Sequence, residues 1–306
     1  MSGVLTDRVA VITGAGQGVG RAYAHALAAA GANVVVNDVP SRSGTSSAEV
    51  VVGEIRAAGG KAVASNASVA DFSGGAVTVD TALNAFGRID IVIANAGIAR
   101  PTTLHEANER QWADVLAVHT NGTFNVYRHA VPHMIEAGGG SVITTGDIST
   151  DLMFPLDAAY RAAKAAIAVF TLYAAEELRE YNINVNSVMP GATDTQMMRT
   201  YFETLGDRRE AFFADVRARY NSDAGARPAS PDSVPPLGIF LASESGRDIT
   251  GRLFTLKHST IRLFTPRGEV ASLPGDDDRL WTNEALSKAV PSWLDRMGTQ
   301  APLASS

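Results

Sequence analysis

The sequence has no cysteine among its 306 residues, so disulfide bonds and thiolate metal sites are excluded. It also has no apolar run of the ~20 residues that a membrane-spanning helix needs. Its first residues lack the charged and apolar pattern of a secretory signal peptide. From these absences we expect a soluble cytoplasmic protein with no membrane partner.

Positive charge is scarce as well. The chain has 26 Lys and Arg against 32 Asp and Glu, which gives a formal net charge of -6. This balance argues against a nucleic-acid partner, because phosphates attract clusters of basic residues. The acidic run at 276–278 is interpreted as a solvated turn rather than as a metal site. We therefore expect no metal.

What the sequence does contain is a regular alternation of strand-like and helix-like segments. Hydrophobic residues make up 45% of the chain, which is enough for a large core. The alternation predicts an α/β fold, a doubly wound parallel sheet with helices on both faces. Strands are expected at 8–13, 33–37, 62–64, 89–94, 141–145 and 184–189, and helices at 46–58, 109–137 (with a break near 121–122) and 156–179.

A glycine-rich turn joins the first strand to the first helix. Gly14, Gly18 and Gly20 open this helix, with Gln17 and Val19 between them. Glycines let the backbone turn sharply and approach a pyrophosphate, and the helix N-terminus offers free N–H groups to that anion. A plain tight turn is the alternative. The strand before the loop and the helix after it favour dinucleotide binding.

Asp38 ends the second strand, about 20 residues beyond the glycine loop. A carboxylate there can accept hydrogen bonds from both hydroxyls of the adenine ribose, and it repels a 2′-phosphate. We therefore expect NAD as the cofactor, with NADP less favoured. A solvated turn residue before Pro40 is the alternative. Arg42 leaves NADP open, because an arginine can hold a phosphate.

Tyr160 and Lys164 lie four residues apart in a predicted helix, so their side chains share one face. A lysine ammonium one turn away favours the phenolate, so we expect the pKa of Tyr160 to fall toward neutrality. Such a tyrosine can act as a general acid or base for a substrate hydroxyl or carbonyl. The same spacing also arises as a solvated lysine beside a half-buried tyrosine. Together with the glycine loop, it indicates an active site.

With these features in hand, the chain resembles the short-chain dehydrogenase/reductase family from about residue 5 to residue 256. Its landmarks, in order, are the loop at 13–20, Asn95-Ala96-Gly97, Tyr160 with Lys164, Pro190-Gly191, and the stretches 239–243 and 249–251. Within the family it is most similar to the hydroxyacyl-CoA dehydrogenase part of multifunctional enzymes. The resemblance implies a Rossmann-type domain at 1–258, an extension at 259–306, and a homotetramer or homodimer.

The resemblance also implies the remainder of a cofactor site. The adenosine side would be lined by Asn95, Ala96, Gly97 and the backbone of Ser68. Many relatives have an aspartate in place of Ala67, so contacts with the adenine would be weaker here. The nicotinamide side would be bordered by Pro190, Gly191, Thr193 and Thr195. Tyr160 and Lys164 would meet the cofactor there, with Lys164 holding the nicotinamide ribose.

One position departs from the family pattern where the reaction takes place. The family has a serine thirteen residues before the tyrosine, and this chain has Asp147. An ionised aspartate cannot donate a hydrogen bond to a carbonyl oxygen, and it raises the pKa of a neighbouring tyrosine. A protonated aspartic acid could donate, and an ionised one could accept a proton from an alcohol. Ser149 is an alternative donor. A third reading is that Asp147 caps a turn and catalysis is weak or absent.

A second departure is His119, which stands where the family has a structural asparagine. By the resemblance, this side chain braces a helix bend and holds a water behind the lysine. Imidazole can donate and accept hydrogen bonds, so we expect His119 to keep that relay. Ordinary packing of a buried histidine is the alternative, and Asn121 is a second candidate for the role.

Residues 195–230 are rich in aromatic and methionine side chains, and in the family this segment forms a lid over the substrate. Met198 and Phe202 in the lid, with Met153 and Phe154 between Asp147 and the tyrosine, would suit a bulky apolar substrate. Ordinary helix packing is the alternative.

In the tail we expect a strand at 260–264 and an amphipathic helix at 281–297, interrupted near Pro291.

These features predict an NAD-dependent oxidoreductase that interconverts a secondary alcohol and a ketone on a medium-to-large apolar substrate. Tyr160 would exchange the hydroxyl proton, Lys164 would assist it, and Asp147 would orient the substrate oxygen. Asp147 also motivates two alternatives. One is a non-redox enzyme that uses this aspartate as a base for elimination, isomerisation or cyclisation, and the other is a non-catalytic NAD-binding protein.

Overall fold

The computed structural model describes residues 3–41, 44–147, 156–206, 214, 228–257, 259–265, 268–273 and 281–296. Its centre is a nine-stranded sheet in the order β3-β2-β1-β4-β5-β6-β7-β8-β9, in which β1 to β7 are parallel and the last two strands are antiparallel. The strands are β1 (Val9–Thr13), β2 (Asn33–Asn37), β3 (Lys61–Ser65), β4 (Ile91–Ala94), β5 (Gly140–Thr145), β6 (Ile183–Pro190), β7 (Arg252–Lys257), β8 (Thr260–Thr265) and β9 (Gly268–Leu273).

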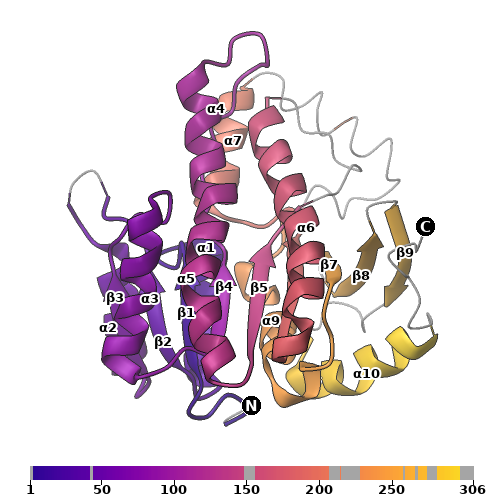
Figure 1. The fold of residues 1–306 in the computed structure, drawn as a ribbon. Helices are drawn as coiled ribbons and strands as arrows, with labels where there is room; N and C mark the ends of the chain where they lie inside the picture. The colour runs from indigo at the N-terminus through magenta and orange to yellow at the C-terminus, as the bar shows by residue number, and fades with distance from the viewer. Residues whose placement is uncertain are drawn as a thin grey trace.

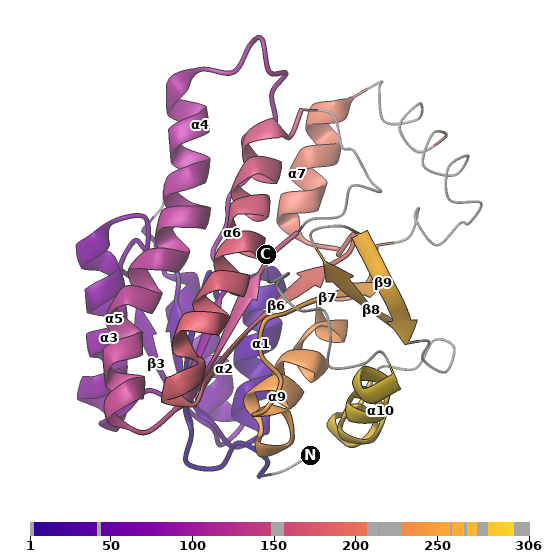
Figure 2. The same cartoon turned by 45° about the vertical axis from the view of Figure 1, so that its right-hand side comes forward.

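Helices cover both faces of this sheet, as Figures 1 and 2 show. They are α1 (Gly18–Ala29), α2 (Ser47–Ala57), α3 (Phe72–Phe86), α4 (Glu109–Leu116), η1 (Ala117–Asn121), α5 (Gly122–Glu136), α6 (Ala158–Leu178), η2 (Arg179–Tyr181), α7 (Gln196–Leu205), η4 (Pro231–Ser233), α9 (Pro235–Ala242), η5 (Glu244–Gly246) and α10 (Asn283–Arg296). The predicted fold class is therefore confirmed.

Two apolar cores hold the layers together, one on each face. On one face, Ile12 and Val34 of the sheet pack against α1, α2, α9 and α10. On the other face, Val11 and Val92 pack against α3, α5 and α6. The parallel strands are buried on both faces, which explains their near-continuous runs of apolar residues. Burial of these two cores provides the main stabilisation of the domain.

The strand order reverses direction beside β1. Strands β2 and β3 lie on one side of β1, and β4 to β7 lie on the other. The loops that leave the carboxyl ends of β1 and β4 therefore diverge, and a crevice opens between them. In doubly wound sheets, ligands bind in this crevice. The fold itself thus indicates where the site lies.

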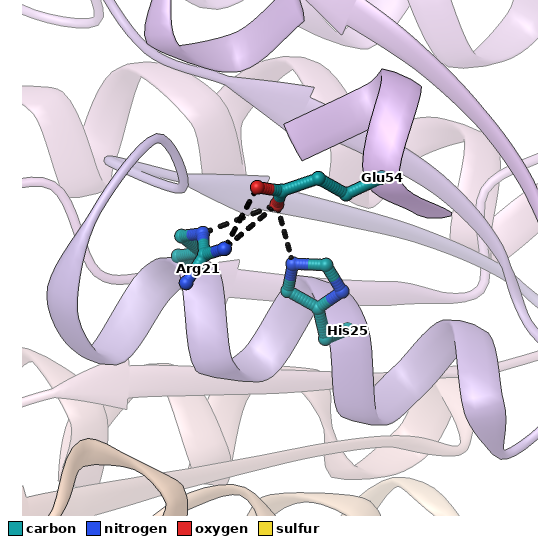
Figure 3. Close-up of polar contacts among 3 residues, drawn as sticks. All are labelled: Arg21, His25 and Glu54. Carbon is teal, nitrogen blue, oxygen red and sulfur yellow. Dashed lines mark hydrogen bonds and ion pairs between the residues drawn. The ribbon is translucent and has the colours of Figure 1, made fainter. Parts of the chain in front are cut away.

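A polar cluster joins α1 to α2 at the surface. The Glu54 carboxylate accepts hydrogen bonds from Arg21 Nη2 at 2.8 and 2.9 Å, and it lies 2.9 Å from His25 Nε2 (Figure 3). All three side chains are exposed by more than a third. Ion pairs in water contribute at most about 1 kcal/mol each, so this cluster adds little to the apolar contact beneath it.

The predicted strands and helices of residues 8–190 agree with the structure to within a few residues. The break expected near 121–122 is a π-helical turn, η1, which separates α4 from α5. The tail strand expected at 260–264 is β8, and it extends the main sheet together with β9, which was not predicted.

The prediction that the tail helix is interrupted at Pro291 is wrong. Helix α10 runs through this proline from Asn283 to Arg296. Leu286, Val290 and Trp293 are buried in the core with α9, and this burial offsets the hydrogen bond that the proline removes. Among the described residues, no helix is long and apolar enough to span a membrane.

Candidate functional site

The crevice at the carboxyl ends of the strands contains a cavity of about 340 Å³. Most residues predicted for the site line it, although they come from segments far apart in the sequence. These are Gly14, Gln17, Gly18, Val19, Asp38, Ser68, Asn95, Ala96, Gly97, His119, Asp147, Tyr160, Lys164, Pro190, Gly191, Thr193, Thr195 and Met198. One cavity therefore brings together the predicted nucleotide loop and the predicted reactive pair.

Two predicted residues with described side chains do not line the cavity. Gly20 is buried in the first turn of α1, close to the Gly14 carbonyl, and Phe202 is half-buried beside Tyr201, with ring centroids 6.1 Å apart. In this part of α7, Met198 and Tyr201 face the cavity. Some predicted residues lie outside the described part of the chain. They are the substrate-site residues Ser149, Met153 and Phe154, and Arg42, which left NADP open.

The glycine loop is shaped for close approach of a ligand backbone. Gly14 has φ +62, and a β-carbon on it would lie 2.7 Å from Ala96 Cα. A β-carbon on Gly20 would overlap the Gly14 carbonyl oxygen. The Asn95 side-chain amide fixes the loop to β4, because its Nδ2 donates to the Thr13 carbonyl at 3.0 Å and to the Gly14 carbonyl at 3.2 Å. The N-terminus of α1 follows at Gly18, so this cradle fits a pyrophosphate.

Asp38 stands at the end of β2, on the cavity wall. Its Oδ2 accepts a hydrogen bond from the Gly16 backbone N–H at 2.8 Å. Burial raises the pKa of Asp38, while backbone hydrogen bonds from Gly16 and Val39 lower it. A carboxylate has about four acceptor positions, so these bonds leave room for ribose hydroxyls. Both the loop and this carboxylate therefore fit the adenosine half of a dinucleotide.

The far side of the cavity is closed by the loop that follows β6. Its backbone is fixed to the sheet because Gly191 N donates to the Leu256 carbonyl at 2.9 Å. The Thr193 hydroxyl donates back to the Gly191 carbonyl at 2.9 Å. The Thr195 hydroxyl accepts from Met198 N at 3.3 Å and thereby caps α7. The loop thus places α7 over the cavity mouth.

Tyr160 and Lys164 both face the cavity from α6. The Lys164 side chain is 3% exposed, and its Nζ donates a hydrogen bond to the Thr145 carbonyl at the end of β5. Its Nζ lies 5.5 Å from the centroid of the Tyr160 ring. Burial lowers the pKa of Lys164 to about 8, while the charge of Asp147 acts in the opposite direction. The pair is therefore assembled as the spacing predicts.

The charge environment of Tyr160 differs from the one predicted. Burial and then the Asp147 carboxylate raise the pKa of Tyr160, whereas the Arg161 guanidinium lowers it. The prediction that this pKa falls toward neutrality is thus wrong for the structure described. The physical reason is that the phenol is desolvated and faces two carboxylates, Asp147 and Asp157, which act against its ionisation.

Asp147 is held in an ion pair. Arg161 Nη1 lies 2.5 Å from Asp147 Oδ2, and Arg161 Nε lies 3.4 Å from Asp157 Oδ2. Burial raises the pKa of Asp157 to about 7, and the charge of Arg161 opposes this rise. The sequence analysis missed Arg161 and Asp157. Their only sequence signal is an Asp and an Arg four residues apart at the start of a helix that carries Tyr160.

His119 lies in the π-helical turn η1, directly behind Tyr160. The two rings meet edge to face, with centroids 5.1 Å apart and planes at 86°. Nε2 of the histidine lies 3.0 Å from Ile98 N and 2.9 Å from Ile98 O, so it braces the loop after β4. Burial and the charge of Lys164 lower the pKa of His119 to about 3, which keeps the ring neutral. The observed contact of His119 is with the Ile98 loop, and the predicted relay through a water behind the lysine stays a prediction.

Comparison with known proteins agrees with this geometry. Residues 8–206 match the family model described as short chain dehydrogenase. That match covers the glycine loop, Asp38, Tyr160 and Lys164, and it spans more than half of the chain. The chain belongs to the short-chain dehydrogenase family. It is therefore an NAD(P)-dependent dehydrogenase or reductase.

Relatives within the short-chain dehydrogenase family differ in length and cofactor. The chain is 42% identical over 289 residues to the peroxisomal hydratase-dehydrogenase-epimerase of Saccharomyces cerevisiae; this match covers 92% of the chain but 29% of that longer protein. A 7 alpha-hydroxysteroid dehydrogenase solved with NADH and 7-oxo glycochenodeoxycholic acid has a TM-score of 0.72 at 26% identity, covering 83% of this chain and 94% of that one.

A third relative was solved with the other cofactor. This short chain dehydrogenase from Burkholderia cenocepacia, in complex with NADP, has a TM-score of 0.72 at 31% identity, covering 83% of this chain and 97% of that one. Members of the family thus bind either dinucleotide, so the cofactor preference of this chain depends on its own residues.

Proposed function

We propose that this short-chain dehydrogenase uses NAD to interconvert a secondary alcohol and a ketone on a medium-to-large apolar substrate. The observation that carries the proposal is that Tyr160 and Lys164 line the same cavity as the glycine loop and Asp38. A phenol, an ammonium and a dinucleotide cradle in one cavity are the parts that this reaction needs.

Cofactor preference follows from the residues at the end of β2. Asp38 presents a carboxylate to the cavity and is held there by the Gly16 N–H. A carboxylate at this point accepts the two ribose hydroxyls of NAD and repels the extra phosphate of NADP. We therefore assign NAD as the preferred cofactor.

When bound in this cavity, NAD would supply the hydride acceptor for oxidation, and NADH would supply the hydride donor for reduction. The residues of the chain handle the proton. In oxidation, the Tyr160 phenolate accepts the proton of the alcohol O–H, and the C–O bond becomes a carbonyl. In reduction, the Tyr160 hydroxyl donates the proton to the carbonyl oxygen. The buried Lys164, anchored on the Thr145 carbonyl, supplies positive charge beside the reacting groups.

An apolar substrate is proposed from the apolar part of the cavity wall. Ile98, Val118, Met197, Met198 and Tyr201 line the cavity there. Methionine side chains adapt to irregular apolar shapes, which suits a bulky ring or chain. The hydroxysteroid dehydrogenase solved with NADH and 7-oxo glycochenodeoxycholic acid is compatible with a bulky substrate.

The alternative of a non-redox enzyme that uses Asp147 as a base receives no support from the geometry. The Asp147 carboxylate is already engaged by Arg161, whose Nη1 lies 2.5 Å from its Oδ2, rather than left open toward a substrate proton. We also propose that the chain assembles as a homodimer or homotetramer. Val169 and Tyr173 are 50% and 62% exposed on one face of α6, where a second copy could cover them.

The test of the proposed function is the variant Tyr160→Phe, assayed with NAD and a panel of apolar secondary alcohols. Turnover should fall by about 100-fold or more, because the proton acceptor is removed. NAD binding, measured by calorimetry, should persist. The matched control is Tyr173→Phe, which removes an exposed hydroxyl from the same helix. Equal turnover by the wild type and Tyr160→Phe would refute the role of the phenol.

A further inference from the structure

Three charged side chains form one connected group in the cavity wall. Arg161 Nη1 lies 2.5 Å from Asp147 Oδ2, and its Nε lies 3.4 Å from Asp157 Oδ2. Their side chains are between 10% and 26% exposed, and all three line the cavity. Asp147 follows β5, whereas the other two lie at the start of α6, so the group joins two segments at the point where Tyr160 enters the cavity.

The guanidinium also lies against the reactive tyrosine. Arg161 Cζ is 5.6 Å from the centroid of the Tyr160 ring, a distance at which a cation and an aromatic face attract each other. Lys164 Nζ is at a similar 5.5 Å but donates its hydrogen bond to the Thr145 carbonyl. Two cations therefore flank the ring, and one of them is tied to a carboxylate.

We infer that Arg161 is a positioning residue for the proton transfer of Tyr160: it holds the Asp147 carboxylate in an ion pair, so that a neutral pair rather than a bare negative charge faces the phenol. This inference rests on the proposed function. It explains how an aspartate can occupy this position without preventing the phenolate from forming. Losing Arg161 removes the positive charge that offsets Asp147, and losing Asp147 removes a negative charge while Arg161 stays beside Asp157.

The charges around the phenol agree with this role. Asp147 and Asp157 raise the pKa of Tyr160, and Arg161 lowers it. Among the described residues, the other titratable groups that face this part of the cavity are Lys164 on α6, His119 on η1 and Tyr201 on α7. Because the His119 ring stays neutral, it adds no competing charge. Removal of one member of the ion pair should therefore move the titration of Tyr160 in a direction set by the sign of the charge that remains.

The test introduces 3-fluorotyrosine at position 160 and follows its ionisation by ¹⁹F NMR in the full-length protein. Asp147→Asn should lower the pKa of this phenol by about one unit, because the negative charge of Asp147 is removed while Arg161 stays. Arg161→Gln should raise it by a similar amount, because the positive charge that favours the phenolate is removed. The double variant should return close to the wild-type titration. A merely structural role would not give shifts of opposite sign.

Two further variants complete the design. Arg161→Lys keeps the positive charge and should titrate much closer to the wild type than Arg161→Gln does. Arg179→Gln removes an exposed arginine, paired with Glu176, just past the other end of α6 and should leave the titration unchanged. The pH profile of kcat/KM for alcohol oxidation should move with the phenol, to lower pH in Asp147→Asn and to higher pH in Arg161→Gln.

The outcomes separate this inference from the proposed function. Shifts of the same sign, or none, in the two single variants would overturn the role of Arg161 even if the enzyme oxidises alcohols. Opposite shifts in the NMR titration of a protein that shows no NAD-linked turnover would support the ion pair and refute the proposed function. Should Arg161→Gln fail to fold, the Asp147→Asn titration still decides the inference: a phenol pKa that does not fall would overturn it.

Discussion

The edge of the His119 ring packs against the ring of Tyr160, with the centroids 5.1 Å apart. This contact depends on the π-helical turn η1, which places the histidine between α4 and α5. On its other side, His119 Nε2 lies within hydrogen-bonding distance of the Ile98 backbone. A buried histidine therefore links the loop after β4 to the residue that we propose exchanges a proton.

The buried state of His119 predicts a loss of stability in acid. Its pKa is lowered to about 3 in the folded protein, against about 6.5 when unfolded. Between these two pH values, His119 is protonated in the unfolded chain and neutral in the folded protein. The free energy of unfolding should therefore fall as the pH falls below about 6.5, by up to about 1.4 kcal/mol per pH unit from this group.

Urea unfolding of the wild type and of His119→Asn, at pH 7 and at pH 5, measures this effect. The variant carries no titrating group at this position, so its stability should change less between the two pH values. An equal pH dependence in the two proteins would show that the histidine is protonated without cost in the folded state.

For Asp157, we expect the free energy of unfolding to depend on pH with the opposite sign. Burial raises its pKa to about 7, so the folded protein keeps a proton that the unfolded chain loses near pH 4. The stability that this group contributes is present at low pH and is lost as the pH rises toward 7. Asp157→Asn should therefore gain stability relative to the wild type between pH 5 and pH 8. Thermal unfolding at both pH values checks this, and a constant difference would contradict it.

The glycine loop predicts a contrast between two glycine-to-alanine variants. In Gly20→Ala, the new methyl group would overlap the Gly14 carbonyl oxygen, so the loop must shift. NAD binding should weaken by more than about tenfold, or ~1.4 kcal/mol, in calorimetry. In Gly53→Ala on α2, the methyl group meets nothing within 4 Å, and helix propensity should add about 0.5–1 kcal/mol of stability. Tight NAD binding by Gly20→Ala would contradict the proposed cradle.

We expect the Asp38 carboxylate to set the preference for NAD over NADP. Asp38→Asn keeps an oxygen that can accept the Gly16 N–H but removes the charge that repels a 2′-phosphate. The ratio of the Kd for NADP to the Kd for NAD should fall by about tenfold or more. Asp80→Asn, an equal change of charge at an exposed position of α3, is the control. An unchanged ratio in Asp38→Asn would mean that Asp38 does not select the cofactor.

Local patterns were sufficient to predict most of the fold and much of the site. Buried valine runs such as 33–37 have the same bounds in the structure as in the prediction, because apolar strands and helix-ending glycines are signalled within a few residues. The glycine loop and the spacing of Tyr160 and Lys164 are local as well. These features line one cavity because the carboxyl ends of parallel strands meet at one edge of the sheet.

What the sequence could not predict depends on contacts between distant segments. The pairing of Asp147 with Arg161 requires the end of β5 and the start of α6 to meet, and no short-range pattern encodes that meeting. The direction of the Tyr160 pKa shift was mispredicted for the same reason. Strand β9 was not predicted because Gly268–Leu273 is short and partly polar, and β8 is its only partner among the described strands.

The most direct test of the central claim follows the hydrogen itself. An apolar secondary alcohol carrying deuterium on its carbinol carbon is incubated with the enzyme and NAD, and the ketone and the reduced cofactor are quantified by mass spectrometry. The account predicts one deuterium in the nicotinamide for each ketone formed, with the reaction abolished in Tyr160→Phe. Product that forms without deuterium in the nicotinamide would contradict it.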